Sequence, residues 1–238
     1  MVKSFSSIAI IPARGGSKRI SRKNIKLING KPAIAYSIEI ANRANLFDEI
    51  FVSTEDHEIA EVAENLGANV TFRRESHLAG DMVSTIDVIA TFIQNLPRNL
   101  ISEETTATCV YPVVPLLNPA RLQEAQDILE INNSGYVFPV LPLISSPTRS
   151  FKLSQDMFIE NVDLENQLER TQDLTQYYYD AGQFYSARAT TWLSRIPIFT
   201  PKSVGLKMKK WEVVDVDTAE DWLLMEQLLR SNHLRGSL

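Results

Sequence analysis

The stretch SIAIIPARGGSKRISRKN, residues 7–24, joins an apolar run to a glycine-containing loop. Its residues 8–11 (IAII) are aliphatic and mostly β-branched, which is typical of a strand buried on both faces. The loop that follows places five positive side chains between residues 12 and 24, although the 238-residue chain has a formal net charge of -5. The positive charge is therefore local, and we look for a local reason for it.

The loop has the features of a phosphate-binding turn. Gly15 and Gly16 behind a strand would expose backbone N–H groups, and Arg14, Lys18 and Lys23 add positive charge. The spacing matches neither GxxxxGK[ST] nor GxGxxG. In open α/β sheets, however, ligands bind at the carboxyl ends of strands, where this loop begins. The alternative is a solvated surface loop without a ligand, as most charged runs are.

Strand and helix patterns alternate up to about residue 140, which predicts a mostly parallel sheet flanked by helices. The predicted strands are residues 7–11, 49–54, 69–72, 106–113 and 135–140, and the predicted helices are residues 31–44, 56–67, 84–96 and 118–131. In the second helix, Asp56 is placed to cap the start and Gly67 to end it.

The alternation of strand and helix patterns ends between residues 141 and 187, where turn residues and aromatics replace the amphipathic helix patterns. We therefore expect an α/β domain formed by residues 1–140 and 188–238, with residues 141–187 as a β-rich insert. The segment WEVVDVDTAEDWLLMEQLLR, residues 211–230, predicts a strand running into an amphipathic helix.

Asp215 and Asp217 are two residues apart, so on an extended strand their carboxylates face the same way and are able to share one hard cation. A magnesium ion there would neutralise phosphate oxygens. The alternative is a helix cap, in which Asp217 or Thr218 begins the helix and acidic residues complement its dipole. The two roles are compatible.

Composition excludes several classes of protein. The net acidity argues against a protein that coats nucleic acid or anionic lipid, and no apolar run reaches the roughly 18 residues of a membrane span. The single cysteine, Cys109, lies in an apolar run and is expected to be buried. We expect a cytoplasmic protein with neither a nucleic-acid nor a membrane partner.

Five motifs in order resemble one family. IPARGGSKRISRKN (11–24), VSTEDHEIAEVAENLGA (52–68), RRESHLAGD (73–81), YPVVPLLNP (111–119) and DVDTAEDW (215–222) are similar to the cytidylyltransferases that activate nine-carbon acidic sugars, the CMP-sialic acid synthetase family. The resemblance implies a three-layer αβα Rossmann-like fold of the nucleotide-diphospho-sugar transferase type. It also implies a homodimer in which the insert of one chain closes the site of the other.

The resemblance assigns roles to particular residues. CTP would be held by the loop and two later positions: Arg14, Gly15, Gly16, Ser17, Lys18, Lys23, Asn24, Arg74 and Thr85. Asp215 and Asp217 would bind Mg²⁺ and act in catalysis together with Lys23. From its residue type and position alone, Arg74 would instead be predicted to be a solvent-facing charge at the end of a strand. No general base is evident.

The sugar would be read by the segment RTQDLTQYYYDAGQFY, residues 170–185. This segment departs from the sialic acid enzymes and resembles the branch that acts on pseudaminic acid, a bacterial nine-carbon sugar. Arg170 would pair with the sugar carboxylate, Gln172 and Gln183 would read polar groups, and Tyr185 would pack on the ring, with Tyr111 as a further contact. The alternatives are a surface ion pair for Arg170 and ordinary strand packing for the tyrosines.

The leading hypothesis is therefore transfer of CMP from CTP to pseudaminic acid. One rival keeps the chemistry and changes the acceptor to sialic, legionaminic or another ulosonic acid. A second rival is a metal-dependent glycosyltransferase that uses Asp215 and Asp217 as a DxD motif. A third is a sugar-nucleotide binding protein without catalysis.

Overall fold

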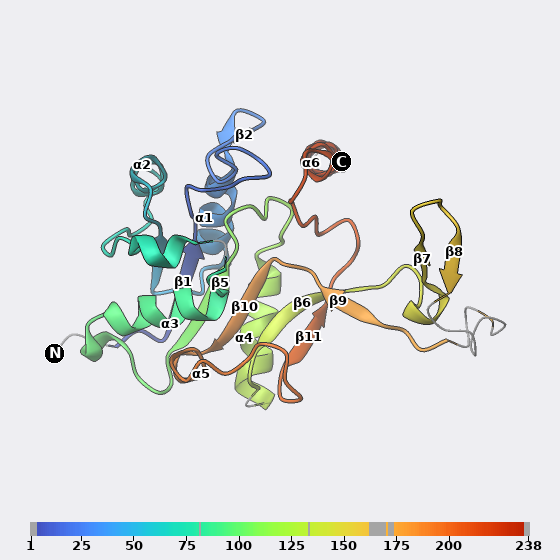
Figure 1. Ribbon diagram of the computed structural model, residues 1–238. Helices are drawn as coiled ribbons and strands as arrows, with labels where there is room; N and C mark the ends of the chain where they lie inside the picture. The colour runs from blue at the N-terminus through green and yellow to red at the C-terminus, as the bar shows by residue number, and fades with distance from the viewer. Residues whose placement is uncertain (1–3, 81, 133, 162–169, 171–173, 236–238) are drawn as a thin grey trace.

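The computed structural model describes residues 4–80, 82–132, 134–161, 170 and 174–235, and it shows a central sheet between two layers of helices (Figure 1). The spatial order of the sheet is β11 (Val204–Lys207), β6 (Val137–Pro142), β10 (Phe184–Arg188), β5 (Thr106–Val110), β1 (Ser7–Pro12) and β4 (Glu49–Ser53), with β9 (Tyr178–Asp180) paired to β6. Within the described residues, β9 and β10 run against the other five strands. The predicted mostly parallel α/β fold is confirmed.

Helices cover both faces of the sheet. One face carries α1 (Ala33–Ala44), α2 (His57–Asn65) and α4 (Ala120–Asn132), and the other carries α3 (Thr85–Asn95) and α5 (Ala189–Leu193). The last helix, α6 (Ala219–Arg235), packs near the short hairpin of β2 (Leu27–Ile28) and β3 (Lys31–Pro32). Single 3-10 turns occur at η1 (Ser76–Ala79), η2 (Arg98–Leu100) and η3 (Pro147–Arg149).

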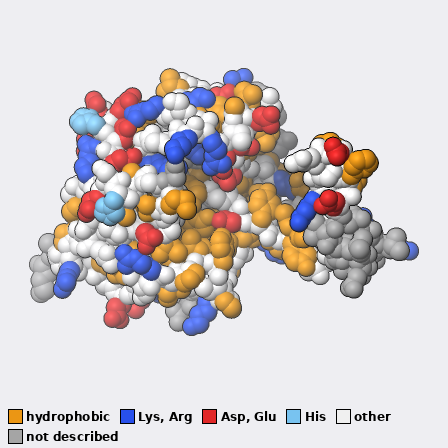
Figure 2. Space-filling view, in the orientation of Figure 1, with side chains coloured by type: hydrophobic (Ala, Val, Ile, Leu, Met, Phe, Trp, Pro, Cys, Tyr) orange, Lys and Arg blue, Asp and Glu red, His pale blue; other side chains and the backbone are white. Residues whose placement is uncertain are grey.

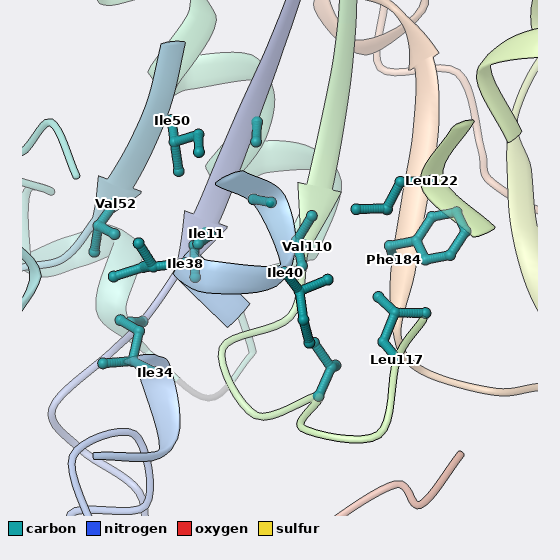
Figure 3. Close-up of a cluster of buried hydrophobic side chains, with 14 of the residues drawn as sticks. Ile11, Ile34, Ile38, Ile40, Ile50, Val52, Val110, Leu117, Leu122 and Phe184 are labelled. Carbon is teal, nitrogen blue, oxygen red and sulfur yellow. The ribbon is translucent and has the colours of Figure 1, made fainter. Parts of the chain in front are cut away.

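The first strand joins the two cores because its side chains alternate between the faces of the sheet. Ala9 and Ile11 pack against α1, whereas Ile8 and Ile10 pack on the side of α3. Figure 3 shows Ile34 and Ile38 of α1 grouped with Ile11 and its neighbours on the sheet. Cys109 on β5 is completely buried, as expected, and burial raises the pKa of its thiol.

The predicted helix ends on α2 are confirmed. The Asp56 carboxylate accepts a hydrogen bond from the backbone N–H of Ile59 at 3.0 Å, as an N-cap does. Gly67 has φ +83°, the left-handed conformation that ends a helix and that glycine adopts without a Cβ clash.

Two predicted strands were wrong. Residues 69–72 form only an isolated bridge between Asn69 and Phe51, because the Asn69 side chain accepts the Thr71 N–H at 2.9 Å and turns the chain. Residues 213–217 run without a partner strand, and side chains instead donate to the carbonyls of Val214 and Val216. The sheet gains β11, which the sequence did not reveal.

Residues 141–187 divide between the sheet and a projection. We call residues 143–161 the arm; it contains β7 (Phe151–Leu153) and β8 (Ile159–Asn161), which pair as an antiparallel hairpin set apart from the sheet (Figure 1). The later strands β9 and β10 belong to the central sheet, and β10 lies between β5 and β6. An antiparallel strand needs no crossover helix, so β10 lacks the βα rhythm by which the other strands were recognised.

The packing of the core on the α3 side is testable at Trp192. It is completely buried, its indole N–H donates to the Ala107 carbonyl at 2.9 Å, and its ring meets Tyr136 edge-on. Replacing Trp192 by Ala should lower the free energy of unfolding by about 3–5 kcal/mol, because a cavity and an unpaired carbonyl remain. Urea unfolding followed by circular dichroism measures this loss. Trp211→Ala, at a half-exposed site, is the matched control, and an equal loss there would contradict the assignment.

Candidate active site

A cavity of about 630 Å³ opens at the carboxyl ends of β1 and β5, a size suited to a small-molecule site. Four separate segments line it: the loop after β1, the region leading into α3, the end of β5, and the segment before α6. The lining residues are Pro12, Arg14, Ser17, Lys18, Arg19, Lys23, Asn24, Arg74, Leu78, Gly80, Val83, Thr85, Val88, Tyr111, Pro112, Asp215 and Asp217. Figure 2 shows Lys and Arg side chains gathered over this end of the molecule.

Lys23 connects the two charged parts of the cavity. Its ammonium donates to the Val216 carbonyl at 2.8 Å and lies 3.7 Å from the Asp217 carboxylate. Burial lowers the pKa of Lys23, and the charges of Asp217 and Asp215 oppose that shift. The loop after the first strand is thereby tied to a segment more than 190 residues later.

Neither glycine of the loop lines the cavity, and Gly15 is needed for packing. The Gly15 N–H donates to the Glu55 carboxylate at 2.7 Å, and a Cβ on Gly15 would lie 2.3 Å from an Asp56 oxygen. Among the described residues that line the cavity, neither Gly15 nor Gly16 is present. The need for glycine at position 15 is therefore explained by close contact with the start of α2, and its N–H is already engaged.

Arg22 likewise has a structural partner. Its guanidinium forms ion pairs with Asp56 and Glu58 at the start of α2, and the hydrogen bond from Arg22 lowers the pKa of the Asp56 carboxyl. One of the five positive charges in the loop therefore holds the loop against α2, and the other four line the cavity.

Arg74 is held from behind and faces the cavity. Its guanidinium donates to the Ser53 carbonyl at 2.6 Å and to the Ser53 hydroxyl at 3.2 Å. Burial lowers the pKa of Arg74, and the nearby charge of Glu55 counteracts the shift. The alternative of a solvent-facing charge at a strand end does not describe this residue.

Asp215 and Asp217 both line the cavity, and the helix cap is made by their neighbours. The Thr218 hydroxyl accepts the Asp221 N–H at 3.2 Å, while the Asp221 carboxylate accepts the backbone N–H groups of Thr218 at 2.7 Å and of Asp217 at 3.1 Å. This is a reciprocal capping box. The Asp217 carboxylate is left to pair with the Arg19 guanidinium at 2.7 Å.

The carboxylate pair is suited to a cation. Burial raises the pKa of Asp215, and the negative charge of Asp217 raises it further. Among the described residues, no group of three or more His, Cys, Asp or Glu side chains is placed to hold a metal. Two carboxylates with phosphate or water oxygens completing the shell is a pattern that Mg²⁺ accepts.

The residues predicted to bind sugar are dispersed. Tyr111 lines the cavity, Arg170 is exposed, and Gln172 lies outside the described residues. Gln183 and Tyr185 are buried, with 1% and 4% exposure, beneath the cavity wall. Gln183 donates to the carbonyls of Ala181 at 3.0 Å and Val214 at 3.5 Å, which supports the segment that carries Asp215.

The sequence did not reveal the apolar part of the wall. It is formed by Pro12, Leu78, Val83, Val88 and Pro112, and Arg19 was also not singled out. Val88 was within reach of sequence reasoning, because residues i and i+3 of a helix share a face and Thr85 was already a candidate. Leu78 lies in the short 3-10 turn η1 and Val83 in irregular backbone, and neither is marked by a periodic pattern.

The fold and the site define an α/β protein that places cationic side chains and a carboxylate pair around one ligand cavity. The family described as Cytidylyltransferase matches residues 8–219. The chain belongs to the cytidylyltransferase family.

Relatives agree with this membership, and a solved structure has a similar fold. The chain is 38% identical to the pseudaminic acid cytidylyltransferase of Campylobacter jejuni, over 96% of this chain and 98% of that one. It is 31% identical to the CMP-N,N'-diacetyllegionaminic acid synthase of Legionella pneumophila, over 94% and 97% of the two chains. Its fold is similar to that of a CMP:2-keto-3-deoxy-manno-octonic acid synthetase complexed with CTP, with TM-score 0.69, 15% identity, and coverage of 95% and 99%.

The helices in the described part of the chain lack the combination of length and apolarity that crossing a membrane requires.

The raised pKa of Asp215 predicts how the unliganded protein responds to pH. A carboxyl with a raised folded pKa contributes stability below its ordinary pKa of about 3.9, and that contribution is lost as pH rises through the folded value. At pH 7 the ionised Asp215 therefore destabilises the fold, and Asp215→Asn should raise the urea midpoint. The gain should shrink as the pH is lowered toward 4.

Asp221→Asn is the matched control of opposite sign. Hydrogen bonds from Thr218 lower the pKa of Asp221, so its contribution is present above the ordinary pKa and is lost as pH falls. Asp221→Asn should lower the urea midpoint at pH 7. A lowered midpoint for Asp215→Asn would show that the Asp215 carboxylate is compensated within the unliganded protein.

Proposed function

We propose that this protein transfers CMP from CTP to the anomeric hydroxyl of pseudaminic acid and releases pyrophosphate. The observation that carries the proposal is that the cationic loop after β1 lines the same cavity as Asp215 and Asp217. The proposal is also supported by the relatives, which are similar to this chain over nearly its whole length. Their names include a cytidylyltransferase and nine-carbon acidic sugars. Because CTP is available in the cytoplasm, that is the proposed location.

The cationic side chains have a defined task in this proposal. Arg14, Lys18 and Lys23 hold the triphosphate, and Ser17 and Asn24 stand beside them in the same wall. Positive charge next to the phosphates stabilises the charge that develops as the sugar hydroxyl forms its bond to the α-phosphorus and the bond to pyrophosphate breaks. Arg74 and Thr85 contact the nucleotide from the side of α3.

Lys23 has a further role as a catalytic residue. Its ammonium is held by the Val216 carbonyl and lies near the Asp217 carboxylate, so its position is set before the ligand binds. A preorganised charge of this kind needs little rearrangement during the reaction, which is the main source of electrostatic catalysis.

Asp215 and Asp217 are the proposed ligands of Mg²⁺. When bound, the ion would neutralise phosphate oxygens and polarise the phosphorus under attack. The carboxylates present fit it: they share one cavity, Asp217 takes no part in the helix cap through its side chain, and the pKa of Asp215 is raised as expected for a charge lacking full compensation.

The enzyme reading is tested by mixing purified protein with CTP, Mg²⁺ and each nine-carbon acid in turn. We expect pyrophosphate release with pseudaminic acid and formation of the CMP-sugar. Turnover only with sialic, legionaminic or another ulosonic acid would overturn the choice of acceptor. Sugar transfer from a supplied nucleotide sugar without pyrophosphate would favour the glycosyltransferase, and binding without turnover would favour the non-catalytic protein.

Asp217→Asn should lower turnover by about a hundredfold or more while leaving the fold intact, because the variant loses a carboxylate that is proposed to hold Mg²⁺ at the phosphates. Asp156→Asn, in an exposed turn of the arm, is the matched control and should retain activity. Initial rates of pyrophosphate release and circular dichroism of both variants provide the test. An Asp217→Asn variant with unchanged turnover would remove the metal assignment.

We also propose that the protein is a homodimer joined through the arm. Phe151, Leu153, Met157, Phe158 and Ile159 are each between 52% and 73% exposed, and Figure 2 shows hydrophobic side chains on the surface of this projection. An isolated two-stranded hairpin is marginally stable in water, so a second copy of the chain that covers it would stabilise it. In this arrangement Arg170, which follows the arm, is placed to contact the sugar in the partner's site.

Light scattering should give a mass of twice 26.9 kDa for the wild-type protein. Placing Asp at both Phe158 and Ile159 should convert the dimer to a monomer, because two charges would have to be buried at the interface. Ile131→Asp, at an exposed position on α4, is the control and should remain a dimer. A monomeric wild-type protein would contradict the proposal.

A further inference from the structure

One oxygen of the Asp217 carboxylate is contacted by two cations of the loop after β1. The Arg19 guanidinium donates to Oδ1 of Asp217 at 2.7 Å, and the Lys23 ammonium lies 3.7 Å from the same oxygen. All three side chains line the cavity. The carboxylate that the proposed function assigns to a metal ion is therefore paired with positive charge in the unliganded protein.

The two cations are held in different ways. Lys23 is partly buried, and the Val216 carbonyl accepts its ammonium at 2.8 Å, so its position does not depend on Asp217 alone. The Arg19 side chain is 67% exposed, and among the described residues it forms an ion pair only with Asp217. An exposed ion pair of this kind is weak, because water competes for both partners. Arg19 is therefore the cation that exchanges partners at little cost.

A divalent cation competes with Arg19 for the Asp217 carboxylate. Two positive charges close to one carboxylate oxygen repel a further cation that approaches it, and the repulsion is strongest at contact distance. In addition, Mg²⁺ is usually held by only one or two carboxylates together with the phosphates of a substrate. In the empty cavity, Arg19 thus makes Asp217 an unfavourable ligand for a metal ion.

A triphosphate changes this balance because it offers Arg19 a stronger partner. A phosphate group accepts two hydrogen bonds from one guanidinium, as a carboxylate does, and the triphosphate as a whole carries more negative charge. Arg19 lines the same cavity as Arg14, Lys18 and Lys23, which the proposed function places on the triphosphate. When Arg19 turns to the phosphates, the Asp217 carboxylate is released for a metal ion.

We propose that Arg19 is a positioning residue that occupies the Asp217 carboxylate while the cavity is empty and releases it when the triphosphate enters, so that the divalent cation binds with the nucleotide and not before it. The proposal rests on the proposed function, from which it takes CTP and the carboxylate pair. It adds an order of binding and the residue that sets this order.

The test measures Mn²⁺ binding to the protein without nucleotide. Mn²⁺ accepts the same oxygen ligands as Mg²⁺, and electron paramagnetic resonance measures its unbound fraction. Arg19→Gln removes the charge and keeps a polar side chain. The Kd of Mn²⁺ should fall by about tenfold or more in this variant, because a carboxylate freed from one cation attracts another more strongly. Circular dichroism of all variants monitors the fold.

Three further variants locate the effect. Arg19→Lys keeps the positive charge and should bind Mn²⁺ as weakly as the wild type. Asp217→Asn in the Arg19→Gln background should lose the gain, because the released carboxylate is gone. Lys31→Gln is the matched control: it removes one positive charge from the Lys31–Glu39 ion pair at the surface, outside the residues that line the cavity, and should leave the Kd of Mn²⁺ unchanged.

The exchange of partners is measured by titrating CTP in the presence of EDTA, so that no divalent cation takes part. Arg19→Gln should raise the Kd of CTP at least about fivefold, because the phosphates lose a cation that turns to them in the wild type. Calorimetry measures this binding without turnover, since no sugar is present.

Four results would overturn the proposal: an affinity of Arg19→Gln for Mn²⁺ no higher than that of the wild type, an equal gain in Arg19→Lys or Lys31→Gln, a gain that persists when Asp217 is also replaced, or an unchanged Kd of CTP in Arg19→Gln. Each leaves the proposed function standing, because pyrophosphate release by the wild-type enzyme is measured separately. A wild-type protein that binds CTP and Mn²⁺ as expected but forms no CMP-sugar with any acid would overturn the proposed function and support the binding order.

Discussion

The hydrogen bond from the Lys23 ammonium to the Val216 carbonyl joins the two parts of the site that the chain separates most widely. It sets the cationic loop after β1 opposite the carboxylates of Asp215 and Asp217, and the Arg19–Asp217 ion pair reinforces it. The two contacts do not compensate both carboxylates. Burial still raises the pKa of Asp215, and the negative charge of Asp217 adds to this shift. The unliganded site thus keeps opposite charges close together without full compensation, which suits a ligand that carries phosphates and a cation.

The sheet provides the support that this arrangement needs. β1 and β5 end at the cavity, and β10 between β5 and β6 brings Tyr185 against Tyr111. The Tyr185 hydroxyl donates to Asp180 at the end of β9. β10 runs against its neighbours, so the turn from β9 enters at the same edge as the loops of the parallel strands. That turn packs on the Asp215 segment through Gly182 and Gln183. The turn between β9 and β10 therefore supports the segment that carries the carboxylate pair.

Sequence reasoning located the cavity well where the signal was chemical and local. Arg14, Lys18, Lys23, Arg74, Thr85, Tyr111, Asp215 and Asp217 all line it. The same reasoning did not anticipate what packs against some of the other candidate residues. Gly15 matches a phosphate-binding turn in the sequence, but its N–H is taken by Glu55 and its missing Cβ makes room for Asp56. Gln183 and Tyr185 have polar groups suited to a sugar, and they are buried beneath the wall.

By itself, the sequence determined the α/β class, the first strand with its basic loop, the capping of α2 and the candidate residues of the cavity, because periodicity, caps and charge runs are local properties. Only the tertiary structure decided that β10 belongs to the central sheet and that the segment of Asp215 and Asp217 runs without a partner strand. These features depend on contacts between segments distant in the chain. A single sequence carries no local pattern for such contacts. The local preferences of each segment are compatible with several tertiary arrangements, and only the contacts between segments select one of them.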